Sequence, residues 1–571
     1  MAKIKQLIEC VPNFSEGRDM GIIQQITDEI RNSAGVRLLD VDPGEATNRT
    51  VVTFVGEPEA VMEAAFRAVR KASQLIDMRQ HHGAHPRSGA TDVLPLVPVA
   101  GITLEECAEL ARKLAKRLAD ELEIPCYCYE AAALKPERKN LAVVRRGEYE
   151  AIPERINDPA EAPDFGARPF DEGVARTGCT NVGARDFLIA VNYNLNTTST
   201  RRANAIAFDV REKGRPAREG NPITGKVKLD ENGKKIMIPG TLKGTKGIGW
   251  YIEEYGIAQV SMNITNINVT PLHVAFDEVC RCAQNRGVRV TGTEIVGLVP
   301  ERTLLEAGRY FLEKQQRSTG ITKEDIINIA IKSLGLSDLK PFNPREKVIE
   351  YLLEDENGDD KALVKMTVKG FAEETSRESP APGGGSVAAY MGALGDALGT
   401  MVANLSSHKP GWDDRWEEFS RWADKGQALS DELLVLVDED TRAFNKIMEA
   451  FGLPKKTDED KRLRSEAIQA ATLFATQVPL QTMQAAFGAF ELCQAMAEFG
   501  NPNSVSDAGV GALAARAAVL GAGLNVKINA ASLKDRETAD KMIAEAEQLI
   551  AEAQKKEAEI IGIVERKINE A

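Results

Sequence analysis

The chain concentrates its histidines in one loop. Of five histidines, His81, His82 and His85 fall within five residues, and neighbouring glycine and proline residues predict a loop just before a strand. Three interpretations are open: a polar surface loop, a metal site with Asp92 as a further ligand, or one imidazole that acts as acid and base. A metal site needs a ligand set that no HExxH-type helix supplies, whereas acid–base chemistry needs one imidazole with a pKa near neutrality. The nearby Arg87 and Asp92 favour acid–base chemistry.

Two further polar clusters follow predicted strands near the amino terminus. One covers residues 13–18, beginning at Asn13, and the other contains Asp40, Asp42, Asn48 and Arg49. Each side chain taken singly could satisfy the backbone of a turn. Together they place several hydrogen-bonding groups on strand-end loops, which suits a polar substrate.

A glycine-rich loop precedes an apolar helix in the second half of the chain. Residues 380–386 are Pro-Ala-Pro-Gly-Gly-Gly-Ser. Such a loop presents free N–H groups and the positive end of a helix dipole to an anion, here at Gly383, Gly384, Gly385 and Ser386. No Lys-Ser/Thr pair follows, so the loop is not a Walker A motif.

Several acids lie inside helical patterns of the same half, at Asp438, Glu439, Asp440 and Asp507. Acids on helices are usually solvated. Their pattern alone therefore singles out none of them as catalytic.

A basic segment interrupts the first half at residues 213–246. It contains nine Lys and Arg residues and three Asp and Glu residues, so it carries +6 in a chain of net charge −13. It could be a solvated hairpin, or it could attract an anionic small molecule.

The elements that must position these residues repeat in the first half. Hydrophobic patterns predict the order β-α-β-β-α-β twice, which is typical of a ferredoxin-like unit. The first set is expected at 7–11, 21–32, 36–41, 50–55, 58–77 and 93–99, followed by a helix at 104–122 and a strand at 126–129. The second is expected at 187–193, 197–211, 248–254, 258–265, 271–286 and 288–290. Two such subdomains side by side would leave a cleft for a ligand.

Helical patterns dominate after about residue 340, and Lys340–Pro344 is the expected hinge. The last helix carries one apolar stripe, which suits a bundle or a dimer seam. The stripe consists of Met542, Ala546, Leu549, Ala553, Ile560, Val564 and Ile568. The sequence thus predicts an α+β half made of two ferredoxin-like βαββαβ subdomains, followed by an all-α helical bundle.

Size and composition limit the class of protein. A chain of 571 residues predicts three or four compact units, and 43% hydrophobic with 27% charged residues excludes wholesale disorder. The net charge of −13 argues against nucleic acid as a partner. The eight cysteines lack disulfide or zinc spacing, so we expect reduced thiols in a cytoplasmic protein. Two low-charge stretches, 387–405 and 508–526, are expected to be closely packed helices and not membrane spans.

In their order along the chain, these motifs resemble the formimidoyltransferase-cyclodeaminase family, bifunctional folate enzymes of histidine breakdown. The matching segments are Glu9–Gly17, Leu38–Asp42, Thr47–Val51, His85–Arg87, Lys246–Tyr251 and Ala381–Ala388. The resemblance covers nearly the whole chain. It implies a transferase with subdomains at 1–180 and 181–326, a linker at 327–344 and a cyclodeaminase domain at 345–571.

The resemblance implies that the transferase half moves a formimino group from N-formimidoyl-L-glutamate to N5 of tetrahydrofolate. His85 would be the catalytic acid and base, with substrate contacts from Asn13, Asn48, Arg49 and Arg87. Folate binding carries over to stretches 166–176 and 240–249, whose basic residues could hold the carboxylates of a poly-γ-glutamylated folate. The residues concerned are Gly166, Ala167, Arg168, Pro169, Phe170, Gly240, Thr241, Leu242, Lys243, Gly244, Lys246, Gly247, Ile248 and Gly249.

For the helical half, the resemblance implies closure of 5-formimidoyltetrahydrofolate to 5,10-methenyltetrahydrofolate with release of ammonia. Asp440 would be the catalytic acid, beside the loop of Gly383, Gly384, Gly385 and Ser386. Family members work as dimers assembled into a larger ring. We expect the same here, with no metal, nucleic acid or membrane partner.

Two features depart from the family pattern: a longer insertion at 215–237 and the added His81 and His82. They affect the expected folate contacts but leave His85 and Asp440 in place. Two alternatives remain, a transferase with a non-catalytic helical dimerisation domain and a non-catalytic folate-binding protein. Retention of His85, Asp440 and the glycine loop disfavours both.

Overall fold

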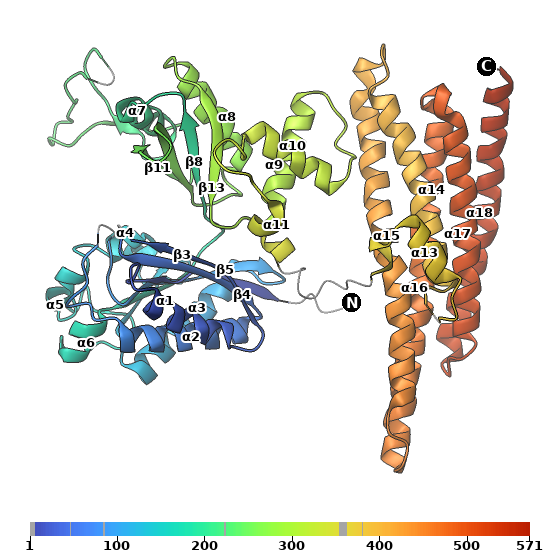
Figure 1. Ribbon diagram of the computed structural model, residues 1–571, viewed down its shortest axis with the longest axis horizontal. Helices are drawn as coiled ribbons and strands as arrows, with labels where there is room; N and C mark the ends of the chain where they lie inside the picture. The colour runs from blue at the N-terminus through green and yellow to red at the C-terminus, as the bar shows by residue number, and fades with distance from the viewer. Residues whose placement is uncertain are drawn as a thin grey trace. The chain divides into compact units, whose positions relative to one another are not determined.

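The computed structural model describes residues 6–45, 47–83, 86–221, 224–352, 362–379 and 381–570. The chain forms two compact units (Figure 1). One comprises Met1–Thr303 with Leu334–Glu356, and the other comprises Leu304–Ser333 with Asn357–Ala571.

The first unit begins with a seven-stranded sheet. Its first elements are β1 (Leu7–Cys10), β2 (Asn13–Phe14), α1 (Met20–Arg31), β3 (Val36–Gly44), β4 (Arg49–Gly56), α2 (Pro58–Leu75) and β5 (Thr91–Ala100). β1 and β2 both lie between β4 and β5, and β3 pairs with the other edge of β4. All these pairs are antiparallel, so the predicted ferredoxin-like βαββαβ order is confirmed.

Three further elements extend this sheet. They are α3 (Leu104–Leu122), β6 (Cys126–Glu130) and β7 (Thr180–Ala184), and β7 lies parallel to and between β5 and β6. The strand β7 was not predicted. Between β6 and β7 the chain forms α4 (Leu141–Val144), α5 (Ile152–Arg155) and α6 (Glu172–Thr177), which together with their connections bring side chains to the histidine loop.

A second, four-stranded sheet follows in the same unit. Its elements are β8 (Ile189–Leu195), α7 (Thr200–Val210), β11 (Thr245–Ile252), β12 (Ile257–Ile264), α8 (Leu272–Gln284) and β13 (Val290–Val296). The antiparallel order β11-β12-β8-β13 repeats the order β3-β4-β1-β5 of the first sheet. The predicted second βαββαβ order of elements is confirmed. The short strands β9 (Arg215–Pro216) and β10 (Met237–Ile238) belong to the basic insertion between α7 and β11.

The connecting region is also helical. It contains α9 (Glu301–Lys314), α10 (Lys323–Leu334) and α11 (Pro344–Lys347), so the segment 327–344 expected as a linker begins inside α10.

The second unit is a bundle of long helices. They are α14 (Gly384–Ser407), α15 (Trp416–Gly452), α16 (Asp458–Phe499), α17 (Val505–Ala530) and α18 (Arg536–Glu570), with the short α13 (Val368–Thr375) beside them (Figure 1). Small residues allow α14 and α17 to approach closely: a Cβ added to Gly395 would lie 2.7 Å from the carbonyl oxygen of Gly511. The predicted fold class, an α+β half followed by an all-helical half, is confirmed.

One described helix, spanning Pro502–Ala530, is long and apolar enough to cross a membrane. Half of its apolar window is buried within the structure, as in the core helix of a bundle. The stripe on α18 is likewise mostly buried, with Ala546, Ala553 and Ile560 fully covered and Ile568 53% exposed.

Candidate active sites

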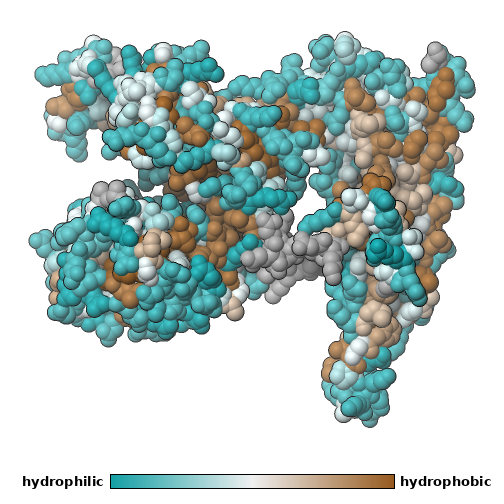
Figure 2. Space-filling view, in the orientation of Figure 1, coloured by the Kyte–Doolittle hydropathy of each residue, from teal (hydrophilic) through white to brown (hydrophobic). Residues whose placement is uncertain are grey.

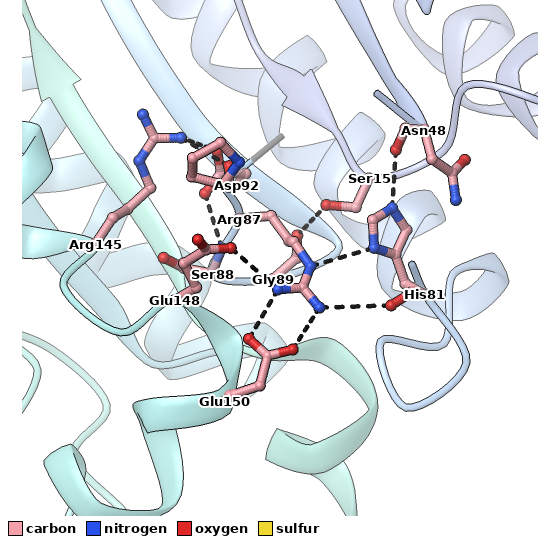
Figure 3. A network of polar contacts seen from close by, with 11 residues as sticks. Ser15, Asn48, His81, Arg87, Ser88, Gly89, Asp92, Arg145, Glu148 and Glu150 are labelled. Atoms are coloured by element: carbon pink, nitrogen blue, oxygen red, sulfur yellow. Dashed lines mark hydrogen bonds and ion pairs between the residues drawn. The ribbon is translucent and has the colours of Figure 1, made fainter. Parts of the chain in front are cut away.

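The histidine loop meets the turn before β4 through His81 (Figure 3). The ring Nε2 of His81 lies 2.8 Å from the carbonyl oxygen of Asn48, and its Nδ1 lies 3.4 Å from Nε of Arg87. Because an arginine nitrogen can only donate, Nδ1 accepts and Nε2 carries the proton. Burial is the main cause that lowers the pKa of His81, so this ring is a neutral positioning group.

Asn48 secures that turn with its side chain. Its Oδ1 accepts a hydrogen bond from the backbone of Gly17 at 3.0 Å, and its Nδ2 donates to the carbonyl of His82 at 3.1 Å. Its φ of 46° lies in the left-handed region, which asparagine adopts more easily than most residues. Asn48 thus joins two of the clusters that the sequence singled out.

Arg87 is held by two glutamates that follow α4 (Figure 3). Both terminal nitrogens donate to Glu150, at 2.6 and 2.8 Å, and Nη1 also donates to Glu148 at 3.2 Å. The bond to Glu150 is the largest cause that raises the pKa of Arg87 and lowers that of Glu150. Arg87 therefore braces the loop, with its charge already balanced by carboxylates.

Asp92 anchors the other end of the loop. It is fully buried, accepts from the backbone of Ser88 at 2.9 Å and pairs with Arg145 at 2.7 Å. Burial raises its pKa, and Arg145 opposes that shift. Among the described residues, no three His, Cys, Asp or Glu side chains form a group that could hold a metal ion.

His85 lies outside the described residues, but both of its flanks are fixed. On one side, a Cβ on Gly83 would overlap the backbone of Thr47, so the chain passes tightly over that turn. On the other side, the carbonyl of Pro86 accepts a hydrogen bond from Arg145 at 3.0 Å. The loop that carries His85 is thus attached to the polar cluster at each end.

The other polar residues predicted in this region have different partners in the structure. Burial lowers the pKa of Arg49, and the charge of the nearby Asp92 partly opposes that shift. Asn13 donates to the carbonyl of Val11 at 3.1 Å and so satisfies its own turn. Ser15 donates to the carbonyl of Gly89 at 2.7 Å, which ties the first strand-end loop to the histidine loop.

The stretch at 166–176 contacts the segment before the histidine loop at its end, where the carbonyl of Arg176 accepts from the backbone of Met78 at 2.9 Å. Gly166 has a φ of 69° and packs against Ala119, and Arg168 pairs with Glu123 at 2.8 Å and with Asp171. The charge of Arg168 is therefore engaged within the protein. Ala167, Pro169 and Phe170 lie in the same connection, and Phe170 packs against a small apolar cluster.

The stretch at 240–249 leads into and forms the edge strand β11. Gly240, Thr241, Leu242, Lys243 and Gly244 turn into it, and Gly249 packs so closely on α7 that a Cβ would overlap the backbone of Asn204. Since side chains alternate along a strand, Lys246, Ile248 and Trp250 lie on the opposite face from Gly247 and Gly249.

That opposite face carries a row of amides. Trp250 donates to Gln259 at 3.0 Å, and the buried Gln259 donates to the buried Asn194 at 2.8 Å. Burial raises the pKa of Glu130 at the end of β6, and the charge of Lys246, near one end of β11, partly opposes that shift. The sheet face thus offers polar and aromatic groups, with a lysine beside the first subdomain.

In the helical unit, Asp440 of α15 meets the start of α14. Its Oδ2 accepts from the backbone of Ser386 at 2.9 Å and from the hydroxyl of Ser386 at 3.1 Å. A Cβ on Gly385 would overlap the carboxylate, so only glycine leaves room for it. Burial raises the pKa of Asp440, while the bonds from Ser386 oppose that shift. Two predicted features, the glycine loop and an acid of the 438–440 cluster, form one site.

The neighbouring acids have other partners. Asp438 accepts from the backbone of Leu363 at 2.6 Å, and Glu439 pairs with Arg442 at 2.9 Å. Asp507 lies in the first turn of α17, where an acid complements the helix dipole. Gly383 caps α14, and Gly384 begins the helix.

Sequence reasoning missed several residues of the first region. Arg145, Glu148 and Glu150 lie in an irregular connection with no periodic pattern. Glu9, on β1, is 5% exposed, and burial raises its pKa to about 7 against the opposing charge of Arg185. Its place in the Glu9–Gly17 motif was the available signal.

Comparison with known proteins covers both units. Family models match the formiminotransferase domain, N-terminal subdomain, at residues 7–185, the formiminotransferase domain at 190–354 and formiminotransferase-cyclodeaminase at 367–548. A formimidoyltransferase-cyclodeaminase of Mus musculus is 42% identical over 562 residues, which cover 98% of this chain and 99% of the mouse protein. The chain belongs to the formimidoyltransferase-cyclodeaminase family.

Shorter proteins are similar to parts of this family member. A glutamate formimidoyltransferase of Streptococcus pyogenes is 40% identical over 313 residues, which are 55% of this chain and 94% of that protein. A methenyltetrahydrofolate cyclohydrolase of Methylorubrum extorquens is 38% identical over 203 residues, which are 36% of this chain and 98% of that protein. The family's two domains thus also occur on separate chains, and both are present here.

Proposed function

We propose that the two regions of this bifunctional formimidoyltransferase-cyclodeaminase act in turn on one folate. The first transfers the formimino group of N-formimidoyl-L-glutamate to N5 of tetrahydrofolate. The second closes the product to 5,10-methenyltetrahydrofolate and releases ammonia. The observation that carries the second step is the partly buried contact between Asp440 and Ser386 at the glycine loop. The family match over the whole chain supports the pairing of the two steps.

In the transfer step, N5 attacks the amidine carbon and loses its proton, and the bond from that carbon to the glutamate nitrogen breaks as the nitrogen gains a proton. We assign both proton transfers to His85, because one imidazole with a pKa near 6.5 can accept and then donate. His81 cannot take this role while its Nδ1 accepts from Arg87 and its Nε2 donates to Asn48. Those bonds instead hold the loop on which His85 lies.

In the cyclisation step, N10 attacks the formimino carbon and loses its proton, and the bond from that carbon to the departing nitrogen breaks once this nitrogen is protonated, so that it leaves as ammonia. We assign that proton to Asp440. Burial raises the pKa of this carboxyl, so a larger fraction of it stays protonated than of an exposed aspartate. The hydrogen bonds from Ser386 then stabilise the carboxylate that remains.

Reciprocal variants test both assignments. The assay mixes protein, N-formimidoylglutamate and tetrahydrofolate and follows glutamate, ammonia and methenyl-folate absorbance together. His85→Ala should abolish glutamate release but still cyclise supplied 5-formimidoyltetrahydrofolate, and Asp440→Asn should do the reverse. Loss of both activities in either well-folded variant would contradict the separation of the two sites. Conversion of methenyl-folate to formyl-folate without ammonia release would instead indicate a cyclohydrolase.

The folate is proposed to carry a polyglutamate tail. Lys243 and Lys246 adjoin the exposed face of β11, and the insertion before them carries an excess of positive charge. Attraction between exposed charges weakens as salt increases. Polyglutamylated tetrahydrofolate should therefore bind more tightly than the monoglutamate at low salt, and equal affinity there would refute the proposal.

The helical unit is proposed to form a homodimer, from which a larger ring assembles. Figure 2 shows apolar residues along the surface of the bundle. On α14 and α17, the exposed apolar side chains include Leu394, Leu405, Leu524 and Ile528, the last two each 70% exposed. Exposed apolar surface of this kind commonly marks a protein interface. A mass measurement in solution tests the assembly, and a monomer at working concentration would overturn it.

The protein is proposed to work in the cytoplasm. All eight cysteines are free thiols, seven of them buried and Cys280 partly exposed. Free thiols persist in a reducing compartment. Localisation of a tagged chain by cell fractionation checks this.

A further inference from the structure

The basic insertion is a folded element, not a loose hairpin. Beyond the β9–β10 pair, Lys228 donates its backbone N–H to Ala217 at 2.8 Å, and Ile236 donates to Lys228 at 3.0 Å. Three short segments therefore pair side by side. Figure 1 shows the insertion projecting beyond α7.

The base of the insertion is fixed to the end of α7. Leu242 donates its backbone N–H to Val210 at 2.8 Å, and Gly214 donates to Arg211 at 2.8 Å. A Cβ on Gly240 would overlap the carbonyl of Arg211, so the two ends pass in direct contact. The side chains of the insertion are thus held over one face of α7.

A cavity of about 630 Å³ lies between that face and the insertion. On α7 and at its C-cap the cavity is lined by Arg201, Asn204, Phe208 and Arg211, which recur at three- and four-residue spacing and so share one side of the helix. Its volume is that of a small-molecule site. No residue of the 240–249 folate stretch lines it.

The lining of this cavity is strongly cationic. It contains no Asp or Glu, and its six cations are Arg201, Arg211, Lys213, Arg215, Arg218 and Lys235. Across the described residues, Arg215 is the one member of this set with an ion pair, to Asp209 at 2.9 Å.

Two arginines of the lining, Arg211 and Arg218, are oriented by neutral groups. Arg211 donates to the carbonyls of Gly214 and Gly247, both at 3.1 Å, and its guanidinium lies 3.9 Å from the centre of the Phe208 ring. Arg218 donates to the carbonyl of Gly225 at 2.7 Å. These bonds fix the side chains without cancelling their charge. Positive groups gathered in a hollow repel one another unless an anion is present.

We propose that this cavity, whose lining contains no residue assigned to either catalytic centre, binds a small polyanion with at least two phosphate or carboxylate groups. Arginine forks bind either group through paired hydrogen bonds, and the lysines add point charges. Two sources would supply such a ligand: a free oligophosphate, or the γ-linked carboxylates of a polyglutamate tail.

Calorimetric titration of the full-length protein at low salt tests the site, with inorganic tripolyphosphate and free γ-triglutamate as separate probes. The test variant is Arg201→Gln/Lys213→Gln/Lys235→Gln, three exposed cations of the lining. The matched control is Lys226→Gln/Lys228→Gln/Lys234→Gln, which removes the same charge from exposed positions of the insertion outside the lining.

We expect saturable binding of at least one probe, weakened about tenfold or more in the test variant and about twofold or less in the control. Binding of tripolyphosphate identifies the ligand as a phosphate compound, and binding of γ-triglutamate identifies it as a polycarboxylate. Absence of saturable binding of either probe, or an equal loss in both variants, would overturn the proposal. Because the titration does not use the reaction, its outcome is independent of the proposed activities.

Discussion

The backbone N–H of Ser386 donates to the carboxylate of Asp440 at 2.9 Å, across 54 residues of chain. The contact places an acid of α15 at the amino-terminal end of α14, where unpaired N–H groups and the helix dipole favour negative charge. Burial acts in the opposite direction and raises the pKa of Asp440. Burial thus favours the protonated carboxyl, while the bonds from Ser386 stabilise the carboxylate that remains after the proton is given up.

Gly385→Ala should disable cyclisation and leave transfer intact. A methyl group at residue 385 would overlap the Asp440 carboxylate and displace it, whereas one at residue 384 would meet Asn525 at an ordinary 3.5 Å. A misplacement of a catalytic group by about 1 Å costs on the order of 10²-fold in rate. Ammonia release from supplied 5-formimidoyltetrahydrofolate measures the effect, with Gly384→Ala as the matched control. Equal activity of the two variants would show that the contact is not needed.

The pH dependence of cyclisation follows from the same carboxyl. If Asp440 donates the proton, turnover at saturating substrate should be high below its pKa and fall as pH rises through it. Because burial raises that pKa above 3.8, the fall should occur at higher pH than for an exposed aspartate. Asp440→Asn removes the titrating group, so its residual activity should lack this limb. A wild-type profile that rises with pH would assign the proton to another group.

The sequence identified the parts of this site but not their contact. The glycine loop was recognised from helix-terminus chemistry, and Asp440 from the family motif, because each signal is local. Which of three consecutive acids faces the loop depends on how α15 is rotated against α14. In the structure Asp440 accepts from Ser386 of the loop, whereas Asp438 accepts from the backbone of Leu363.

His81→Ala should slow formimino transfer without shifting its pH profile. The change removes the ring that donates to the Asn48 carbonyl and accepts from Nε of Arg87 at a buried position, which costs about 1–3 kcal/mol of local stability and loosens the catalytic loop. Steady-state kinetics should show a lower kcat and the same acidic limb, because the pKa of the buried His81 is already lowered. The exposed His82 provides the control, and His82→Ala should be close to wild type. Disappearance of the acidic limb in His81→Ala would make His81 the base.

Strand β7 could not be predicted from its own residues. Thr180–Ala184 contains one β-branched apolar residue, Val182, and ends in glycine and alanine, so it gives no clear strand signal. It is a strand because β5 and β6 pair with it from both sides. The two βαββαβ units were predictable because their alternating patterns are local.

Asp396 should make the helical unit less stable as pH rises. It lies fully buried on α14, and neither carboxylate oxygen has a hydrogen-bond partner of good geometry among the described residues. Burial raises its pKa to about 8, partly opposed by the backbone of Ser430 on α15. On α16 the nearby thiol of Cys493 is neutral, because burial raises its pKa to about 12.

The direction of this pH dependence follows from the protonation of Asp396 in the folded and unfolded states. In the unfolded chain the carboxyl ionises near pH 3.9, while in the folded protein it stays protonated until about pH 8. Between these values the unfolded state gains stability by losing a proton, so the free energy of unfolding falls by up to about 1.4 kcal/mol per pH unit. Asp396→Asn removes this titration and should raise the melting temperature at high pH while differing least at low pH. Calorimetry across that range measures it, with the exposed Asp414→Asn as control. Parallel curves for wild type and Asp396→Asn would show that the buried carboxyl does not titrate in this range.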